Sequence, residues 1–302
     1  MDKEKKAIER LKLASDMSLQ YYEQPLIVTT SGGKDSDVCI QLALNAGIHF
    51  EVQHNLTTAD APETVYHVRN TFKRLENKGI KCSFNYPTYK GKRATMWNLI
   101  PQKLLPPTRI MRYCCTVLKE QGGKGRMITT GVRWDESVRR KNTRATYELF
   151  ANKTENKILL NDNDDTRRLF ENCQLKAKRI VNPIIDWTNR DIWNYIHSEN
   201  IQMNPLYNYG FHRVGCIGCP MAGKGRILEF AKYPKYKENY IKAFDRMLEQ
   251  RKIKGKKTQW KTGQEVFDQW VEKDVMEGQI NLFEEENTNE QSNFNGKISE
   301  RA

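Results

Sequence analysis

Long apolar runs are missing from this sequence of 302 residues. A membrane-spanning helix needs roughly 18 apolar residues in a row, and no segment approaches that length. The first six residues are mostly charged and no apolar stretch follows them, so they do not resemble a secretory signal. We therefore expect a cytoplasmic protein without membrane contact.

The seven cysteines are an odd number at uneven spacing, which argues against a disulfide framework. Four of them form two close pairs, Cys114-Cys115 and Cys216-Cys219. In a reducing compartment, close pairs indicate metal or redox chemistry more often than disulfides.

Acidic residues are outnumbered by basic ones, and the formal net charge is +13. Such an excess favours a polyanionic partner through the summed field of the protein. That partner is either a nucleotide with several phosphates or a nucleic acid. Charge alone does not separate the two.

Strand and helix patterns alternate along the first 130 residues. Residues 25–30 form a short β-branched run typical of a buried parallel strand, and a glycine turn and a helical pattern follow directly. Further strands are predicted at 49–56, 81–86 and 126–130. This order predicts an α/β fold with a doubly wound, mostly parallel, Rossmann-like sheet and a smaller helical C-terminal region.

Composition divides the chain into four parts. We expect an N-terminal helix in residues 1–24, a nucleotide-binding domain in 25–220, a basic helical region in 221–276 and a disordered acidic tail in 277–302. A polar stretch at 148–166 interrupts the strand and helix pattern, and we interpret it as a surface hairpin.

The glycine turn is the most informative segment. Gly32 and Gly33 permit backbone angles closed to other residues, so successive N–H groups can face one anion. The next helix points its positive N-terminal end at the same place, and Lys34 adds a full charge. The spacing fits neither the Walker pattern nor the dinucleotide pattern. We predict a phosphate-binding loop.

The run Ser31-Gly32-Gly33-Lys34-Asp35-Ser36 resembles the PP-loop of the adenine nucleotide α-hydrolase superfamily. Four later segments, in order, resemble the phosphoadenylyl-sulfate (PAPS) reductase-like branch of that superfamily. The resemblance covers about residues 25–220. The four segments are Thr58-Ala59-Asp60-Ala61-Pro62-Glu63-Thr64, Gly131-Val132-Arg133-Trp134-Asp135-Glu136-Ser137, Asn182-Pro183-Ile184-Ile185-Asp186-Trp187 and Asn204-Pro205-Leu206-Tyr207.

The resemblance implies an adenine-nucleotide site with Mg²⁺ accompanying ATP, for which Asp35 or Asp60 is a candidate ligand. Arginine suits bidentate contacts with phosphate or sulfate oxygens. We expect catalytic roles for Lys34, Asp35 and Arg133. The predicted nucleotide-binding residues are Ser31, Gly32, Gly33, Lys34, Asp35, Ser36, Thr58, Gly131, Arg133, Arg139 and Arg140.

The two cysteine pairs offer four thiolates, which suit zinc or an iron–sulfur cluster. Adjacent cysteines fit poorly around one tetrahedral ion, whereas a cubane offers them separate iron corners. The resemblance favours the cluster, because reductases of the adenylyl-sulfate type bind a 4Fe-4S cluster through such pairs. It also implies that Lys119 lies beside the cluster. Zinc is the alternative. The predicted ligands are Cys114, Cys115, Cys216 and Cys219.

One family feature has no counterpart in the sequence. The sulfate-assimilating reductases carry a nucleophilic cysteine in a Glu-Cys-Gly-Leu-His motif near the C-terminus, and no cysteine follows Cys219 here. We therefore expect an ATP pyrophosphatase that adenylates a target oxygen for replacement by sulfur. Such chemistry serves tRNA thiolation and DNA phosphorothioation, so nucleic acid and a sulfur donor are expected partners.

Two alternatives stay open. The first is a reductase that forms sulfite from adenylyl sulfate or phosphoadenylyl sulfate, using a thiol from a thioredoxin-like protein. The second is a non-catalytic module that senses a nucleotide or a cluster.

Overall fold

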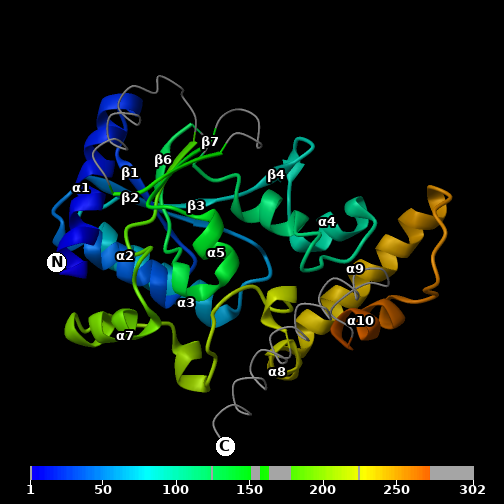
Figure 1. Cartoon of the computed structure of the whole chain (residues 1–302). Coiled ribbons are helices and arrows are strands. Elements are labelled where there is room, and N and C mark those ends of the chain that lie inside the picture. The colour runs from blue at the N-terminus through cyan, green and yellow to red at the C-terminus, as the bar shows by residue number, and fades with distance from the viewer. Residues whose placement is uncertain (1, 124, 151–156, 163–177, 224, 273–302) are drawn as a thin grey trace, which may run out of the picture. The chain divides into compact units, whose positions relative to one another are not determined.

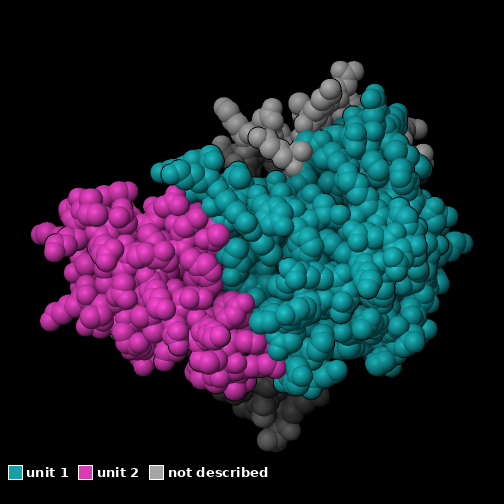
Figure 2. Space-filling view, turned by 180° about the vertical axis from the view of Figure 1, so that it is seen from behind, with its two compact units in different colours: residues 1–94, 117–216 teal, residues 95–116, 217–302 magenta. Residues whose placement is uncertain are grey.

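The computed structural model describes residues 2–123, 125–150, 157–162, 178–223 and 225–272. The predicted acidic tail at 277–302 lies outside them. The chain divides into two compact units (Figure 2): unit 1 holds residues 1–94 and 117–216, and unit 2 holds residues 95–116 and 217–302. Each unit is described by itself.

Unit 1 contains the predicted sheet (Figure 1). Strand β7 pairs antiparallel with both β9 and β8, and the other four strand pairs of this sheet are parallel, so the mostly parallel α/β fold is confirmed. The order is β3-β2-β1-β6-β9-β7-β8. The strands are β1 (Leu26–Thr30), β2 (Phe50–Asn55), β3 (Cys82–Asn85), β6 (Met127–Thr129), β7 (Tyr147–Phe150), β8 (Lys157–Leu160) and β9 (Lys178–Val181).

The antiparallel pair β7 and β8 falls in the stretch where the sequence predicts a surface hairpin. The prediction of a surface position is wrong for these strands, because they belong to the main sheet and Leu149 and Leu160 are buried in its core. Residues 151–156 and 163–166 of that stretch lie outside the described residues.

Helices of unit 1 follow the strands as the pattern predicts. The predicted N-terminal helix is α1, which begins after Asp2, whose side chain accepts a hydrogen bond from the Glu4 amide. The others pack around the sheet or connect its strands. The helices are α1 (Lys3–Tyr22), α2 (Lys34–Asn45), α3 (Pro62–Glu76), α5 (Val138–Thr143) and α7 (Asn189–Ser198).

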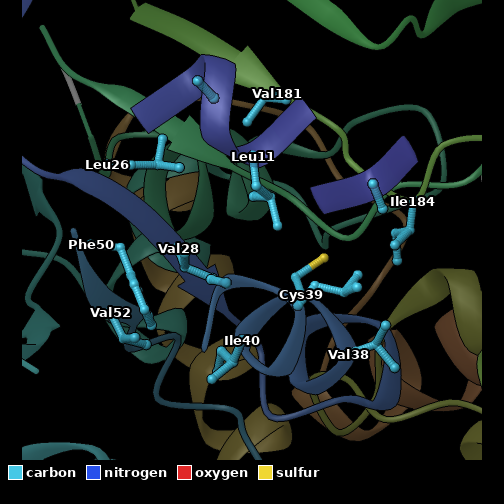
Figure 3. Close-up of a cluster of buried hydrophobic side chains, with 14 of the residues drawn as sticks. Leu11, Leu26, Val28, Val38, Cys39, Ile40, Phe50, Val52, Val181 and Ile184 are labelled. Carbon is cyan, nitrogen blue, oxygen red and sulfur yellow. The ribbon is translucent and has the colours of Figure 1, made fainter. Parts of the chain in front are cut away.

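The core of unit 1 joins strands β1 and β2 to helices α1 and α2 (Figure 3). Its side chains are buried and apolar, so they hold the strand and helix on either side of the glycine turn in fixed positions. Cys39 of α2 is fully buried among them. The labelled residues are Leu11, Leu26, Val28, Val38, Cys39, Ile40, Phe50, Val52, Val181 and Ile184.

Unit 2 is helical, which confirms the predicted C-terminal helical region. Residues 95–116 group with the C-terminal helices. Aromatic rings fill the unit: Trp270 contacts Tyr240 at 4.8 Å and Phe244 at 5.4 Å between ring centroids. The helices are α4 (Met96–Lys103), α8 (Gly225–Lys232), α9 (Pro234–Ile253) and α10 (Gly263–Glu272).

Within the described residues, no helix has the length and apolar character needed to cross a bilayer.

In a parallel sheet, the loops that follow the strands all leave from the same edge of the sheet. Thr30 of β1 is level with His54 of β2, and His54 is level with Phe84 of β3. The segments after these three strands therefore start side by side, at the edge where open α/β sheets bind ligands.

Candidate functional site

The predicted phosphate loop, residues 31–36, connects β1 to α2. Gly32 has a φ of +71°, a conformation that L side chains rarely adopt. A Cβ atom on Gly32 would lie 2.8 Å from Cγ2 of Thr64 and 3.0 Å from Cγ2 of Val68, both on α3. Both the angle and the close approach to α3 therefore require glycine.

Hydrogen bonds inside the phosphate loop fix its curvature. The Ser36 hydroxyl donates to the Gly33 carbonyl at 2.7 Å and accepts the Ser31 amide at 3.3 Å. The Gly32 amide donates to the Thr30 hydroxyl at 3.1 Å. Ser36, predicted to contact the nucleotide, is buried and engaged within the loop.

Among the described residues, two backbone N–H groups at the start of α2 have no hydrogen-bond acceptor. Gly33 caps the helix without a side-chain hydrogen bond. Within the described part of the chain, no acceptor is found for the amides of Gly33 and Asp35, while the Lys34 amide donates to the Tyr207 hydroxyl at 3.0 Å. Unsatisfied amides at a helix N-terminus attract anions.

Two buried cations meet at Asp35. The Lys34 ammonium lies 2.9 Å from Oδ2 of Asp35, and Nε of Arg133 donates to Oδ1 of the same carboxylate at 2.7 Å. Lys34 is 7% and Arg133 is 3% exposed. Arg133 also lies 3.3 Å from Asp135, which is more exposed. The Lys34 ammonium and the Arg133 guanidinium are thus held in position by the carboxylates of Asp35 and Asp135, which are more exposed than the two cations.

The loop after β6 approaches α2 closely at Gly131. A Cβ atom there would lie 2.9 Å from the carbonyl carbon of Asp35. The structure thus brings Gly131 and Arg133 to the phosphate loop. Arg139 and Arg140 lie on the surface helix α5, where Arg140 pairs with Glu136.

Asn204 and Tyr207 support the phosphate loop, although the sequence analysis gave them no role. The Asn204 amide group donates to the Gly32 carbonyl at 2.9 Å and to the Thr64 hydroxyl at 3.0 Å. Burial and the negative charges of Asp35 and Asp37 raise the pKa of Tyr207, so its hydroxyl stays protonated. The Asn-Pro-Leu-Tyr segment, which resembles a motif of the family, was the sequence feature that could have predicted these contacts.

Replacing Tyr207 with phenylalanine should lower the free energy of unfolding by about 1 kcal/mol, because the Lys34 amide loses its acceptor. Urea denaturation measures the change. Tyr66→Phe is the matched control, since Tyr66 is 64% exposed and its change should be negligible. Equal losses in both variants would contradict a special role for the Tyr207 hydroxyl.

A histidine of α3 and an aspartate of α2, the helix that follows the phosphate loop, form a buried pair. Nε2 of His67 on α3 is 2.8 Å from Oδ2 of Asp37 on α2. Burial raises the pKa of Asp37, although the hydrogen bond and charge of His67 oppose that rise. The pair connects the first turn of α2 to α3.

The loop after β2 is strained. Thr58 has a φ of +64°, an unusual value for a β-branched residue. Asp60 is 7% exposed and accepts the Thr57 amide at 3.1 Å. Burial alone would raise the pKa of Asp60, but the nearby His54 and Lys119 hold it below its usual range. Asp60 is thus already engaged within the protein.

The four candidate metal ligands are divided between the units: Cys216 belongs to unit 1, and Cys114, Cys115 and Cys219 belong to unit 2. None of them forms a disulfide. Among the described residues, no three His, Cys, Asp or Glu side chains are grouped closely enough to hold a metal ion. The four-cysteine site stays a prediction.

Two of these cysteines have side-chain contacts within their own units. Nη2 of Arg112 donates to Sγ of Cys115 at 3.4 Å. Sγ of Cys216 lies 3.4 Å from the Thr57 hydroxyl, and Cys216 pairs with Asp60 in an isolated β-bridge. The Cys216 backbone is thereby attached to the loop after β2.

Comparison with known proteins places most of unit 1 in one family. The sequence model of the phosphoadenosine phosphosulfate reductase domain matches residues 25–222. An uncharacterized protein of Methanocaldococcus jannaschii is 28% identical over 261 residues, which cover 82% of this chain and 54% of that protein.

Other known proteins are similar to this chain over a shorter stretch or at lower identity. An adenosine 5'-phosphosulfate reductase of Anoxybacillus flavithermus is 41% identical over 51 residues, or 17% of this chain and 22% of that enzyme. A crystal structure of a phosphoadenylyl-sulfate reductase from Candida auris aligns with 70% of this chain and 87% of its own, at 15% identity and a TM-score of 0.42. The chain spans about half the length of the Methanocaldococcus relatives that it matches.

Proposed function

Because the chain belongs to the phosphoadenosine phosphosulfate reductase domain family, we propose that it is an enzyme that binds an adenine nucleotide on the phosphate loop. The nucleotide that we assign is ATP. The reaction that we assign is cleavage between the α- and β-phosphates, with transfer of the AMP group to an acceptor oxygen that sulfur then replaces.

The observation that carries this proposal is the set of donors around the phosphate loop. The Gly33 and Asp35 amides have no acceptor among the described residues, and the Lys34 ammonium and the Arg133 guanidinium lie on either side of Asp35. Because these donors are already fixed in position, they can stabilise the charge that develops on a leaving phosphate, and the donors do not have to reorganise. A bound polyphosphate would take the place of Asp35 as the partner of both cations.

The assigned reaction has two steps. The acceptor oxygen attacks the α-phosphorus, the bond from that phosphorus to the α–β bridging oxygen breaks, and pyrophosphate leaves with the electron pair. A sulfur nucleophile from an external donor then displaces AMP from the acceptor. Lys34 and the loop amides would hold the pyrophosphate as its charge develops.

Mg²⁺ would neutralise part of the phosphate charge when it is bound with ATP. Of the two candidate ligands, Asp35 fits better, since its side chain is 22% exposed and lies in the phosphate loop. Asp60 is almost fully buried and bonded to the Thr57 amide.

For the four cysteines we propose a 4Fe-4S cluster, with zinc as the alternative. The donor set suits it, because thiolates are the usual ligands of such clusters, and no described cysteine is consumed in a disulfide. Purification without oxygen, followed by measurement of iron, sulfide and absorbance, tests this assignment. Zinc without iron would contradict it.

A second candidate function is reduction of adenylyl sulfate or phosphoadenylyl sulfate to sulfite by an external thiol. The 51-residue match to an adenosine 5'-phosphosulfate reductase favours it. Offering ATP, adenylyl sulfate and phosphoadenylyl sulfate separately distinguishes the two. Pyrophosphate without sulfite supports the first function and sulfite supports the second. No turnover of any nucleotide would contradict both.

Replacing Lys34 with alanine should weaken nucleotide binding about 10- to 100-fold, because one charge-assisted contact to phosphate is lost. Isothermal titration with a non-hydrolysable ATP analogue measures the dissociation constant. Lys12→Ala is the control, since Lys12 is exposed on α1 and its loss should leave affinity unchanged. Unchanged affinity in the Lys34 variant would count against the loop assignment.

A further inference from the structure

A small hairpin leaves the sheet directly after β3. Residues 86–93, the basic hairpin, contain strands β4 (Thr88–Tyr89) and β5 (Lys92–Arg93) (Figure 1). The connecting residues Lys90 and Gly91 have φ values of 52° and 75°, as a two-residue type I′ turn requires. The Ala94 amide donates to the Pro87 carbonyl at 2.8 Å and closes the base. The hairpin thus holds its side chains in a defined geometry.

Each face of the basic hairpin carries one tyrosine and one cation. Thr88 pairs with Arg93 and Tyr89 pairs with Lys92. Since strand side chains alternate, Tyr86 shares a face with Arg93. The Arg93 guanidinium lies 4.5 Å from the centre of the Tyr86 ring, and that ring is 53% exposed. Lys90 lies 5.7 Å from the centre of the Tyr89 ring.

The basic hairpin sits in the middle of a segment without negative charge. No Asp or Glu occurs between Glu76 and Glu120. Lys90, Lys92 and Arg93 are all exposed, and within the described residues neither Lys90 nor Lys92 forms an ion pair. The charged side chains of this segment are therefore all basic, which favours a polyanion.

The basic hairpin and the phosphate loop both start at one edge of the sheet in unit 1. Thr30, His54 and Phe84 are level across β1, β2 and β3. Tyr86 and Ser31 therefore leave the same edge of the sheet, two strand spacings or about 10 Å apart. A polymer held by the hairpin lies within reach of a nucleotide on the loop.

We propose that the basic hairpin binds a single-stranded nucleic acid. Exposed aromatic rings beside Lys and Arg suit unpaired bases, which stack on the rings while phosphates meet the cations. A duplex buries its base faces and offers the tyrosines nothing to stack on. That the bound strand is the acceptor of the AMP group rests on the proposed function, whereas the binding itself needs no ATP.

The test uses the full chain and fluorescence anisotropy with labelled oligonucleotides of about 12 nucleotides, as single-stranded RNA, single-stranded DNA and duplex DNA. Single strands should bind more tightly than duplex, and the two single-strand arms identify the preferred sugar. Equal affinity for single strands and duplex would overturn the proposal.

Two variants probe the two contacts separately. Tyr86→Leu should weaken single-strand binding about 5- to 100-fold without changing its salt dependence, because stacking is lost. The double variant Lys90→Gln/Lys92→Gln should weaken it and reduce the slope of log affinity against log salt by about 1.4, since two phosphate contacts are lost. Unchanged binding in both variants would overturn the proposal.

A matched control removes the same charge elsewhere. Lys254→Gln/Lys256→Gln changes two exposed lysines after α9 in unit 2, and it should affect binding much less than the hairpin variant. Equal effects would show that net charge and not the hairpin binds the strand. Lys34→Ala should keep oligonucleotide binding while its nucleotide binding is weakened, so failure of the hairpin proposal and failure of the proposed function are distinguishable.

Discussion

Gly32→Ala is expected to lower the free energy of unfolding by about 2–5 kcal/mol and to weaken nucleotide binding more than tenfold. Part of the loss is backbone strain, because a φ of +71° costs an L side chain about 1–2 kcal/mol. The rest arises because the new Cβ would meet Thr64 at 2.8 Å and Val68 at 3.0 Å, and overpacking adds about 1–3 kcal/mol. Urea denaturation and calorimetric titration with ATP measure the two effects.

Gly47→Ala separates strain from packing. Gly47 has a similar φ of +64°, but nothing lies within 4 Å of a Cβ added there. This control should lose only about 1–2 kcal/mol and keep nucleotide affinity. If Gly32→Ala were no more destabilising than Gly47→Ala, the close packing of the phosphate loop on α3 would not matter for stability.

The strand, turn and helix that form the phosphate loop were predictable because their signals are local. A β-branched run, two glycines and a helical pattern follow one another within residues 25–45, and each element specifies its own structure from its own residues. The alternation of such units also predicted the parallel sheet correctly. The antiparallel direction of β7 depends on its pairing with β9 and β8, which no local pattern encodes.

The partners inside the site were not predictable in this way. Lys34 and Arg133 were expected to face a nucleotide, and nothing local indicated that Asp35 pairs with both of them. The contacts of Asn204 and Tyr207 with the loop join residues more than 170 positions apart. Such contacts follow from the topology of the sheet, which brings distant segments to one edge.

The second substitution with a large expected effect on stability is at a buried arginine. Arg10 of α1 is 3% exposed and its guanidinium makes bonds in several directions. It donates to the Pro183 carbonyl at 2.6 Å, to both oxygens of Asp186 at 2.8 and 3.0 Å, and to Asp162 at 3.0 Å. It therefore joins the N-terminal helix to the segment before α7 and to the residues after β8.

Arg10→Met is expected to lower the free energy of unfolding by about 3 kcal/mol near neutral pH, because it leaves two partly buried carboxylates without their main counter-ion. The value is at the lower end for buried pairs, since Asp162 and Asp186 are 25% and 22% exposed and Lys6 stays near both. Lys12→Met, an exposed change on the same helix, should stay within about 0.5 kcal/mol of the wild type.

The pH dependence of this loss provides a sharper test. Burial alone would raise the pKa of Asp162 and of Asp186, but hydrogen bonds and charge from Arg10 hold both pKa values below the usual range. A carboxylate with a lowered folded pKa contributes stability above its unfolded pKa of about 4, and that contribution disappears as the pH falls through the folded pKa. The wild type and Arg10→Met should therefore differ most near neutral pH and converge below about pH 4. Urea denaturation of both proteins across this range measures the difference. A gap that stays constant with pH would mean that Arg10 stabilises the fold through packing rather than through these carboxylates.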